Sequence, residues 1–129
     1  MASHTKVQLD DLDDAAPGSG MEGMSFRGAR EALGCEQTGL SLQAIEPGVR
    51  QPFGHAHGEE EEIYVVLEGS GTVMCDGDPV EVRAMDAVRI GPGVMRAVEA
   101  GDDGLTFLAF GGPGNGIADA EMRPGWWGG

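Results

Sequence analysis

The sequence predicts a small all-β domain, in the form of a sandwich or a barrel. Short apolar runs, rich in β-branched residues, recur at regular spacing between residues 40 and 110. Turn signals separate these runs, and glycine accounts for 23 of the 129 residues. No long stretch repeats its apolar residues with the helical period of about 3.6 residues.

The length and the charge of the chain restrict its function. A chain of 129 residues forms one domain with a single modest core. The formal net charge of −14 argues against nucleic acid and anionic membranes as partners, because both require basic surfaces. No stretch is long enough for a membrane span, and no basic-then-apolar leader begins the chain, so we expect a soluble, cytoplasmic protein. In that compartment Cys35 and Cys75 are expected to be free thiols.

Residues 1–24 are polar and acidic, and we expect an N-terminal arm there. Val7 and Leu9 allow a short edge strand; otherwise the arm is mobile. The next segment, from Phe26 to Leu33, has no clear pattern.

The strands of the predicted domain follow in order, each bounded by residues that favour turns. They cover residues 40–46, the segment around His55, and residues 63–67, 72–75, 79–82, 87–90, 94–98 and 105–110. Asp76-Gly77 is a strong signal for a two-residue hairpin turn. Further turns are expected at 69–71, 91–93 and 101–104, where glycines cluster.

Residues 112–129 form a Gly- and Pro-rich C-terminal tail that is too sparse to fold alone. It ends with Trp126 and Trp127, which are costly to leave in water. We expect these two rings to lie on the barrel or on a partner subunit. The chain thus divides into an arm (1–24), a barrel domain (25–111) and a tail (112–129).

A histidine pair and a glutamate run are the most informative polar residues. His55 and His57 are one residue apart in an expected strand, so their side chains share a face and could chelate a metal through both imidazoles. Four glutamates, Glu59 to Glu62, follow, and one carboxylate would complete a two-histidine, one-carboxylate set. The competing interpretation is a surface histidine pair followed by a solvated acidic edge.

This stretch resembles the first motif of the cupin superfamily. In that motif His-x-His is followed by three or four residues, a glutamate, six residues and a glycine; the matching residues here are His55, His57, Glu62 and Gly69. Six residues, rather than the motif's five, separate Gly48 from His55. The six-residue spacing to Gly69 selects Glu62 as the carboxylate and places Glu59 to Glu61 outside the cavity.

The resemblance implies a small single-domain cupin with a jelly-roll β-barrel over roughly Leu40 to Phe110. It also implies that His55, His57 and Glu62 hold a divalent transition metal, which could be Fe, Mn, Ni, Cu or Zn. Cupins include dioxygenases, isomerases and decarboxylases, and the residues do not choose among these activities.

The second cupin motif is only partly kept. Met85 replaces its first glycine, Gly91 replaces its proline, and Gly93 matches. Arg96 stands where the last metal-binding histidine belongs, and Ala100 replaces the asparagine. We therefore expect the backbone turn to persist without the fourth ligand.

Arg96 changes the chemistry that the resemblance implies. A guanidinium has no lone pair for a cation, and its positive charge opposes metal binding nearby. We expect Arg96 to point into the barrel, where it pairs with Glu62 or with an anionic ligand. The alternative is that it turns outward into solvent.

Three functions remain open at this point. The first is a metal-dependent enzyme, for example an oxygenase or isomerase, and the second is a metal-free module that binds or senses a small, anionic molecule through Arg96. Tyr64 is a candidate ligand-binding residue, although an aromatic core position explains it as well. The third is a structural or partner-binding dimer. In each case we expect a homodimer, because pairing covers exposed strand edges.

Overall fold

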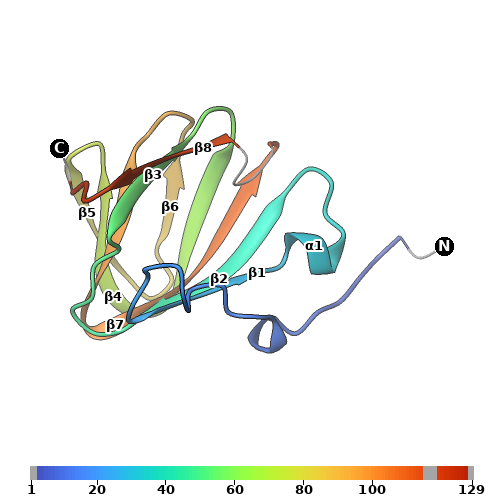
Figure 1. Cartoon of the computed structure of the whole chain (residues 1–129), viewed down its shortest axis with the longest axis horizontal. Coiled ribbons are helices and arrows are strands. Elements are labelled where there is room, and N and C mark those ends of the chain that lie inside the picture. The colour runs from blue at the N-terminus through green and yellow to red at the C-terminus, as the bar shows by residue number, and fades with distance from the viewer. Residues whose placement is uncertain (1–2, 115–118, 128–129) are drawn as a thin grey trace.

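The computed structural model describes residues 3–114 and 119–127 (Figure 1). Within these residues, eight strands form one curled antiparallel sheet, accompanied by the short helices η1 (Leu9–Asp11) and α1 (Arg30–Leu33). The strands are β1 (Met24–Gly28), β2 (Gly39–Ile45), β3 (Phe53–His57), β4 (Glu61–Cys75), β5 (Asp78–Arg83), β6 (Ala87–Ile90), β7 (Arg96–Gly112) and β8 (Ala120–Pro124). The predicted all-β, jelly-roll fold is confirmed.

The two longest strands, β4 and β7, pair with each other and run through both layers of the barrel. The first layer contains β1, β2, the second half of β7, the first half of β4, and β6. The second layer contains β5, the second half of β4, the first half of β7, β3 and β8. Figure 1 shows how the sheet curls so that these layers face each other.

The turns predicted at 69–71 and 101–104 are wrong, because β4 and β7 continue through both segments. The pairing of the two strands shifts register between Val66 and Glu68 and again between Gly69 and Gly71. A Cβ atom at Gly69 would lie 2.0 Å from the carbonyl oxygen of Gly104. The glycines therefore permit a close approach of two bent strands, which is the other common role of glycine in a sheet.

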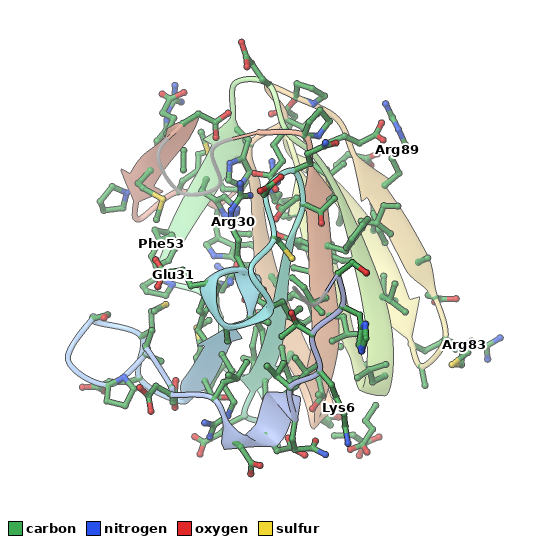
Figure 2. All side chains as sticks on the ribbon, turned by 90° about the vertical axis from the view of Figure 1, so that its right-hand side faces the viewer. Lys6, Arg30, Glu31, Phe53, Arg83 and Arg89 are labelled. Carbon is green, nitrogen blue, oxygen red and sulfur yellow. The ribbon has the colours of Figure 1, made fainter. Side chains whose placement is uncertain are left out.

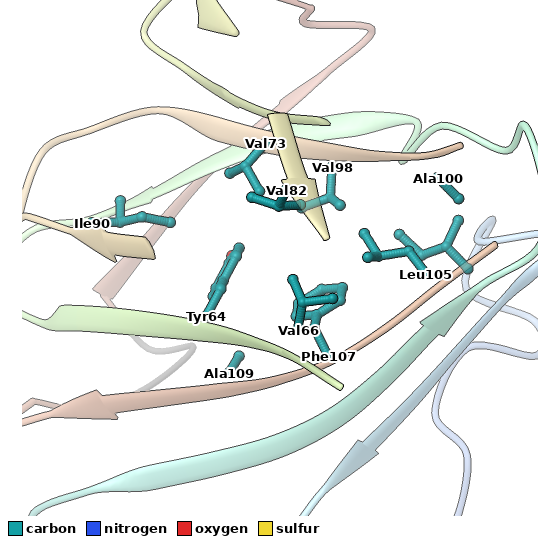
Figure 3. Close-up of a cluster of buried hydrophobic side chains, with 11 residues drawn as sticks. Tyr64, Val66, Val73, Val82, Ile90, Val98, Ala100, Leu105, Phe107 and Ala109 are labelled. Atoms are coloured by element: carbon teal, nitrogen blue, oxygen red, sulfur yellow. The ribbon is translucent and has the colours of Figure 1, made fainter. Parts of the chain in front are cut away.

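The hydrophobic core lies between the two layers of the barrel (Figure 3). Val66 and Phe107 from the first layer face Val73 and Val98 from the second. Tyr64 belongs to this core, with 2% of its surface exposed, and packs against Phe107. The remaining members are Ile45, Val82, Ile90, Ala100, Leu105 and Ala109.

The C-terminal segment covers the outside of the second layer. Strand β8 pairs along the whole of β3, and the buried Trp126 ring packs against Gly54 and Met95. The Trp127 indole nitrogen donates a hydrogen bond of 2.9 Å to the carbonyl oxygen of Gln51. Of the two placements expected for the tryptophans, the structure has the one on the barrel.

The N-terminal segment has no strand at Val7 and Leu9, so that expectation is wrong; residues 9–11 form a 3-10 turn instead. The segment is attached at Asp14, whose carboxylate accepts hydrogen bonds from the backbone N–H groups of Phe26, at 2.8 Å, and Ala16, at 2.9 Å. These hydrogen bonds lower the pKa of Asp14. None of the helices in the described residues has the length and hydropathy of a membrane span.

Candidate functional site

Strand alternation places a polar site beside the apolar core. The inward side chains of β4 are Glu62, Tyr64 and Val66 in turn, and those of β7 begin with Arg96 and Val98. The barrel is therefore apolar at one end and polar at the other. Of the predicted site residues, His55, His57, Glu62 and Arg96 lie at the polar end, whereas Tyr64 lies in the core and borders Arg96.

The structure brings His55, His57 and Glu62 together. Both histidines project from β3, and the Nε2 atom of each lies 3.8 Å from Glu62 Oε1. Their rings meet edge to face with centroids 5.2 Å apart. One ligand atom from each of the three residues falls within 4.8 Å of the others.

Arg96 lies inside the barrel, directly opposite His55 in the pairing of β3 with β7. Its side chain has no exposed surface, and Nη2 donates a hydrogen bond to Glu62 Oε1. Nη1 donates to the carbonyl oxygen of Val94, at 3.0 Å. By contrast, Figure 2 shows Arg83 and Arg89 projecting from the outer surface.

The ion pair and the burial set the protonation states at this end of the barrel. Burial raises the pKa of Glu62, but the nearby His55 imidazole and the charge of Arg96 outweigh it and bring the pKa to about 2. Burial lowers the pKa of His55, which favours the neutral imidazole. Burial also raises the pKa of Tyr64, so its phenol stays protonated beside Arg96.

These residues fit an ion pair better than a metal ion. A cation with bonds of about 2.1 Å could reach the three ligand atoms only after small movements, because both Nε2 atoms lie 3.8 Å from Glu62 Oε1. However, the Glu62 oxygen that faces both histidines is already held by Arg96. A metal ion would have to displace this guanidinium and then tolerate its charge.

Glu60 corrects one expectation from the sequence. Glu59 and Glu61 are exposed, as expected, but Glu60 is only 4% exposed and its Oε2 atom lies 3.4 Å from His57 Nδ1. Burial raises the pKa of Glu60. Glu60 directly precedes β4, and its spacing of two residues from the inward Glu62 was the signal for its inward position.

Asp119 is a site residue that the sequence analysis missed. Its Oδ1 atom lies 2.9 Å from His57 Nδ1, and its Oδ2 atom accepts a hydrogen bond of 3.1 Å from the backbone N–H of Glu59. The hydrogen bond with His57 lowers the pKa of Asp119. His57, Glu60 and Asp119 thus form a second group with ligand atoms within 4.8 Å of one another.

Comparison with known proteins agrees with this architecture. The family model described as "Cupin domain" matches residues 41–110. A cupin protein from Bacteroides fragilis is similar, with a TM-score of 0.72, 25% identity, and coverage of 90% of this chain and 89% of that chain. No curated protein matches the sequence.

Two further structures share the fold at lower identity. PAC13 of Streptomyces, determined with uridine, has a TM-score of 0.77 and 12% identity, over 99% of this chain and 96% of that chain. The polyketide cyclase RemF of Streptomyces resistomycificus has a TM-score of 0.72 and 22% identity, over 95% of this chain and 86% of that chain. On the family match and this fold, the chain belongs to the cupin family.

Proposed function

We propose that this cupin binds a small polar organic molecule inside its barrel, in contact with His55, His57 and Arg96, without a metal ion in the His55–His57–Glu62 set. The observation that carries the proposal is the buried ion pair between Arg96 and Glu62. Arg96 stands at the position where the family presents its last metal-binding histidine, and its charge is paired with that of Glu62. The site then works through hydrogen bonds and not through a Lewis acid.

Unpartnered polar atoms indicate the chemistry of the ligand. Within the described residues, the buried atoms His55 Nδ1 and Arg96 Nε have no hydrogen-bond partner. A carbonyl or hydroxyl oxygen would accept from Arg96 Nε, and a hydroxyl could also exchange a hydrogen bond with His55. Because Glu62 already neutralises Arg96, an anionic ligand would have to compete with this carboxylate. We therefore favour a neutral ligand over the anionic one expected from the sequence.

A metal-dependent enzyme is the second candidate, and the spacing of the ligand atoms of His55, His57 and Glu62 supports it. In that case the three residues would hold the ion, which would polarise a bound oxygen atom of the substrate. The ion could bind only if the hydrogen bond between Arg96 and Glu62 were broken.

A ligand screen with matched variants separates the two candidates. Thermal-shift measurements with neutral hydroxy and carbonyl compounds, and with small carboxylates in parallel, should give stabilising compounds mainly in the neutral set. Stabilisation should be lost in His55→Ala and kept in Glu61→Gln, which changes an exposed residue of β4. Stoichiometric metal in the purified protein that disappears in His55→Ala would instead support the metal-dependent enzyme.

A further inference from the structure

A second cluster of ligand atoms lies on the other side of His57. We propose that this cluster, made of His57 Nδ1, Glu60 and Asp119 and here named the Asp119 cluster, binds a divalent transition-metal cation. The cluster shares only His57 with the set that contains His55 and Glu62, and it uses the other ring nitrogen. The proposal does not depend on the small-molecule function proposed above.

The distances between ligand atoms in the Asp119 cluster are close to those in a metal coordination shell. His57 Nδ1 lies 2.9 Å from Asp119 Oδ1 and 3.4 Å from Glu60 Oε2. Two metal bonds of about 2.1 Å at angles of about 90° to 110° separate their ligand atoms by about 3.0 to 3.4 Å. A cation would therefore need only small movements of these three side chains.

Glu60 provides the observation that points to a ligand. Its side chain is 5% exposed, and within the described residues its Oε2 atom has no hydrogen-bond partner. Gly111 makes the space for this carboxylate, because a Cβ atom there would lie 2.2 Å from Glu60 Oε1. A buried carboxylate oxygen without a partner is costly, and a cation beside His57 would supply the missing partner.

The charges favour the Asp119 cluster over the set around Glu62. Two carboxylates and one imidazole match the charge of a divalent ion, whereas Arg96 cancels the single carboxylate of Glu62. One nitrogen and two oxygen ligands suit zinc, manganese or ferrous iron. The side chain of Asp119 is 19% exposed, which gives the ion a route from solvent.

The test is a metal titration of the full chain after treatment with a chelator. We expect one zinc ion per chain by calorimetry, and affinity reduced at least about tenfold in both Glu60→Gln and Asp119→Asn. The matched controls are Glu59→Gln and Glu121→Gln, which each remove one exposed negative charge close to the cluster. Their affinity should stay within about threefold of the wild type, because they remove charge without removing a ligand.

His55→Ala should also keep the zinc affinity, since His55 is not part of the Asp119 cluster. Failure of the wild type to bind zinc, or loss of binding in His55→Ala but not in Asp119→Asn, would overturn the proposal. Nitrogen NMR of the wild type provides a test that needs no variant. Zinc bound at His57 Nδ1 with the proton on Nε2 supports the proposal, and zinc bound at Nε2 with the proton on Nδ1 contradicts it. Neither result bears on whether small molecules bind beside His55 and Arg96.

Discussion

At the scale of single residues, we expect Arg96 to determine which ligand the barrel interior accepts. Its guanidinium occupies the fourth-ligand position and holds the Glu62 oxygen that faces both histidines. Arg96→His should restore a neutral donor and remove a positive charge, so we expect zinc or manganese affinity at the His55 set to rise at least about tenfold. Calorimetry in an Asp119→Asn background isolates this set from the Asp119 cluster.

Arg96→Gln is the control for this experiment, because it removes the charge without adding a metal donor. Its affinity should rise less than that of Arg96→His. Equal affinities in the two variants would show that position 96 does not present a ligand to the metal.

The depressed pKa of Glu62 makes stability depend on pH. The folded protein keeps the carboxylate ionised down to about pH 2, whereas the unfolded chain protonates it near its ordinary pKa of 4.5. The contribution of Glu62 is therefore complete above about pH 4.5 and is lost as the pH falls towards 2, which amounts to at most roughly 3 kcal/mol. The lowered pKa of His55 acts in the same direction, beginning below its ordinary value of 6.5.

Urea unfolding between pH 7 and pH 2.5 would measure this loss. In Glu62→Gln the protein should be less stable at pH 7, because Arg96 is left without its partner, and the decline below pH 4.5 should be shallower. A decline of the same steepness in the variant would assign the acid sensitivity to other carboxylates.

Met85 is a residue whose backbone conformation suits glycine. It occupies the position of the first glycine of the second cupin motif, its φ angle is 74°, and its side chain is 81% exposed. Met85→Gly should raise the free energy of unfolding by about 1 kcal/mol, because it relieves the left-handed strain with little loss of packing. Met85→Ala, which keeps the strain, should give no increase, and urea unfolding of both variants provides the comparison.

Sequence alone identified only part of the candidate site. The spacing of the cupin motifs pointed to His55, His57, Glu62 and Arg96, which the structure brings together. Glu60 was misplaced because the spacing of the motif selected Glu62 alone, although Glu60 lies two residues before Glu62 and is buried. Asp119 could not be found, because its contact with His57 depends on the pairing of β8 with β3 and spans 62 positions of the sequence.

At the scale of the elements, turn chemistry was predictable where the backbone needs one particular residue type. Asp76 and Gly77 have φ angles of 49° and 88° and join β4 to β5, as their sequence predicts. Gly69 and Gly71 gave a similar signal, but they lie inside β4. Glycine is required there because the backbone of β7 approaches too closely for a Cβ atom. The local sequence cannot distinguish a glycine needed for a turn from a glycine needed for the close approach of another strand.

The attachment of the C-terminal segment depends on a glycine in β3. A Cβ atom at Gly54 would lie 2.5 Å from the Trp126 ring, so Gly54→Ala should displace this ring and loosen β8. We expect a loss of about 1 to 3 kcal/mol in the free energy of unfolding and a red shift of tryptophan fluorescence. Gly39→Ala in β2 is the matched control, since its nearest neighbour would be 3.8 Å away. Unchanged fluorescence in Gly54→Ala would contradict the packing of Trp126 on β3.

At the scale of the whole molecule, the family and the fold were predictable because the motifs, the strand spacing and the glycine content agree. The path of the terminal segments was not. Both are held by contacts with distant strands, such as that of Asp14 with β1 and those of β8 and Trp126 with β3, and composition does not specify such contacts. The tail expected at 112–129 consequently includes a strand that borders the candidate site.

The homodimer stays a prediction, and the structure changes the reason for it. Trp126 packs on its own barrel, so it no longer argues for a partner. Exposed apolar side chains remain on the outer face of the first layer, where Phe110 is 44% exposed and borders a groove of about 230 Å³ together with Ile63. A second copy placed there would remove apolar surface from water and cover strand edges nearby.

Light scattering at micromolar concentration should therefore give twice the mass of one chain. Phe110→Asp should shift the protein to the monomer, because a charge in an apolar interface is costly to bury. Met85→Asp, at an exposed apolar residue that does not line this groove, should leave the dimer intact. A monomeric wild type would rule out the dimer, and equal dissociation in both variants would place the interface elsewhere on the molecule.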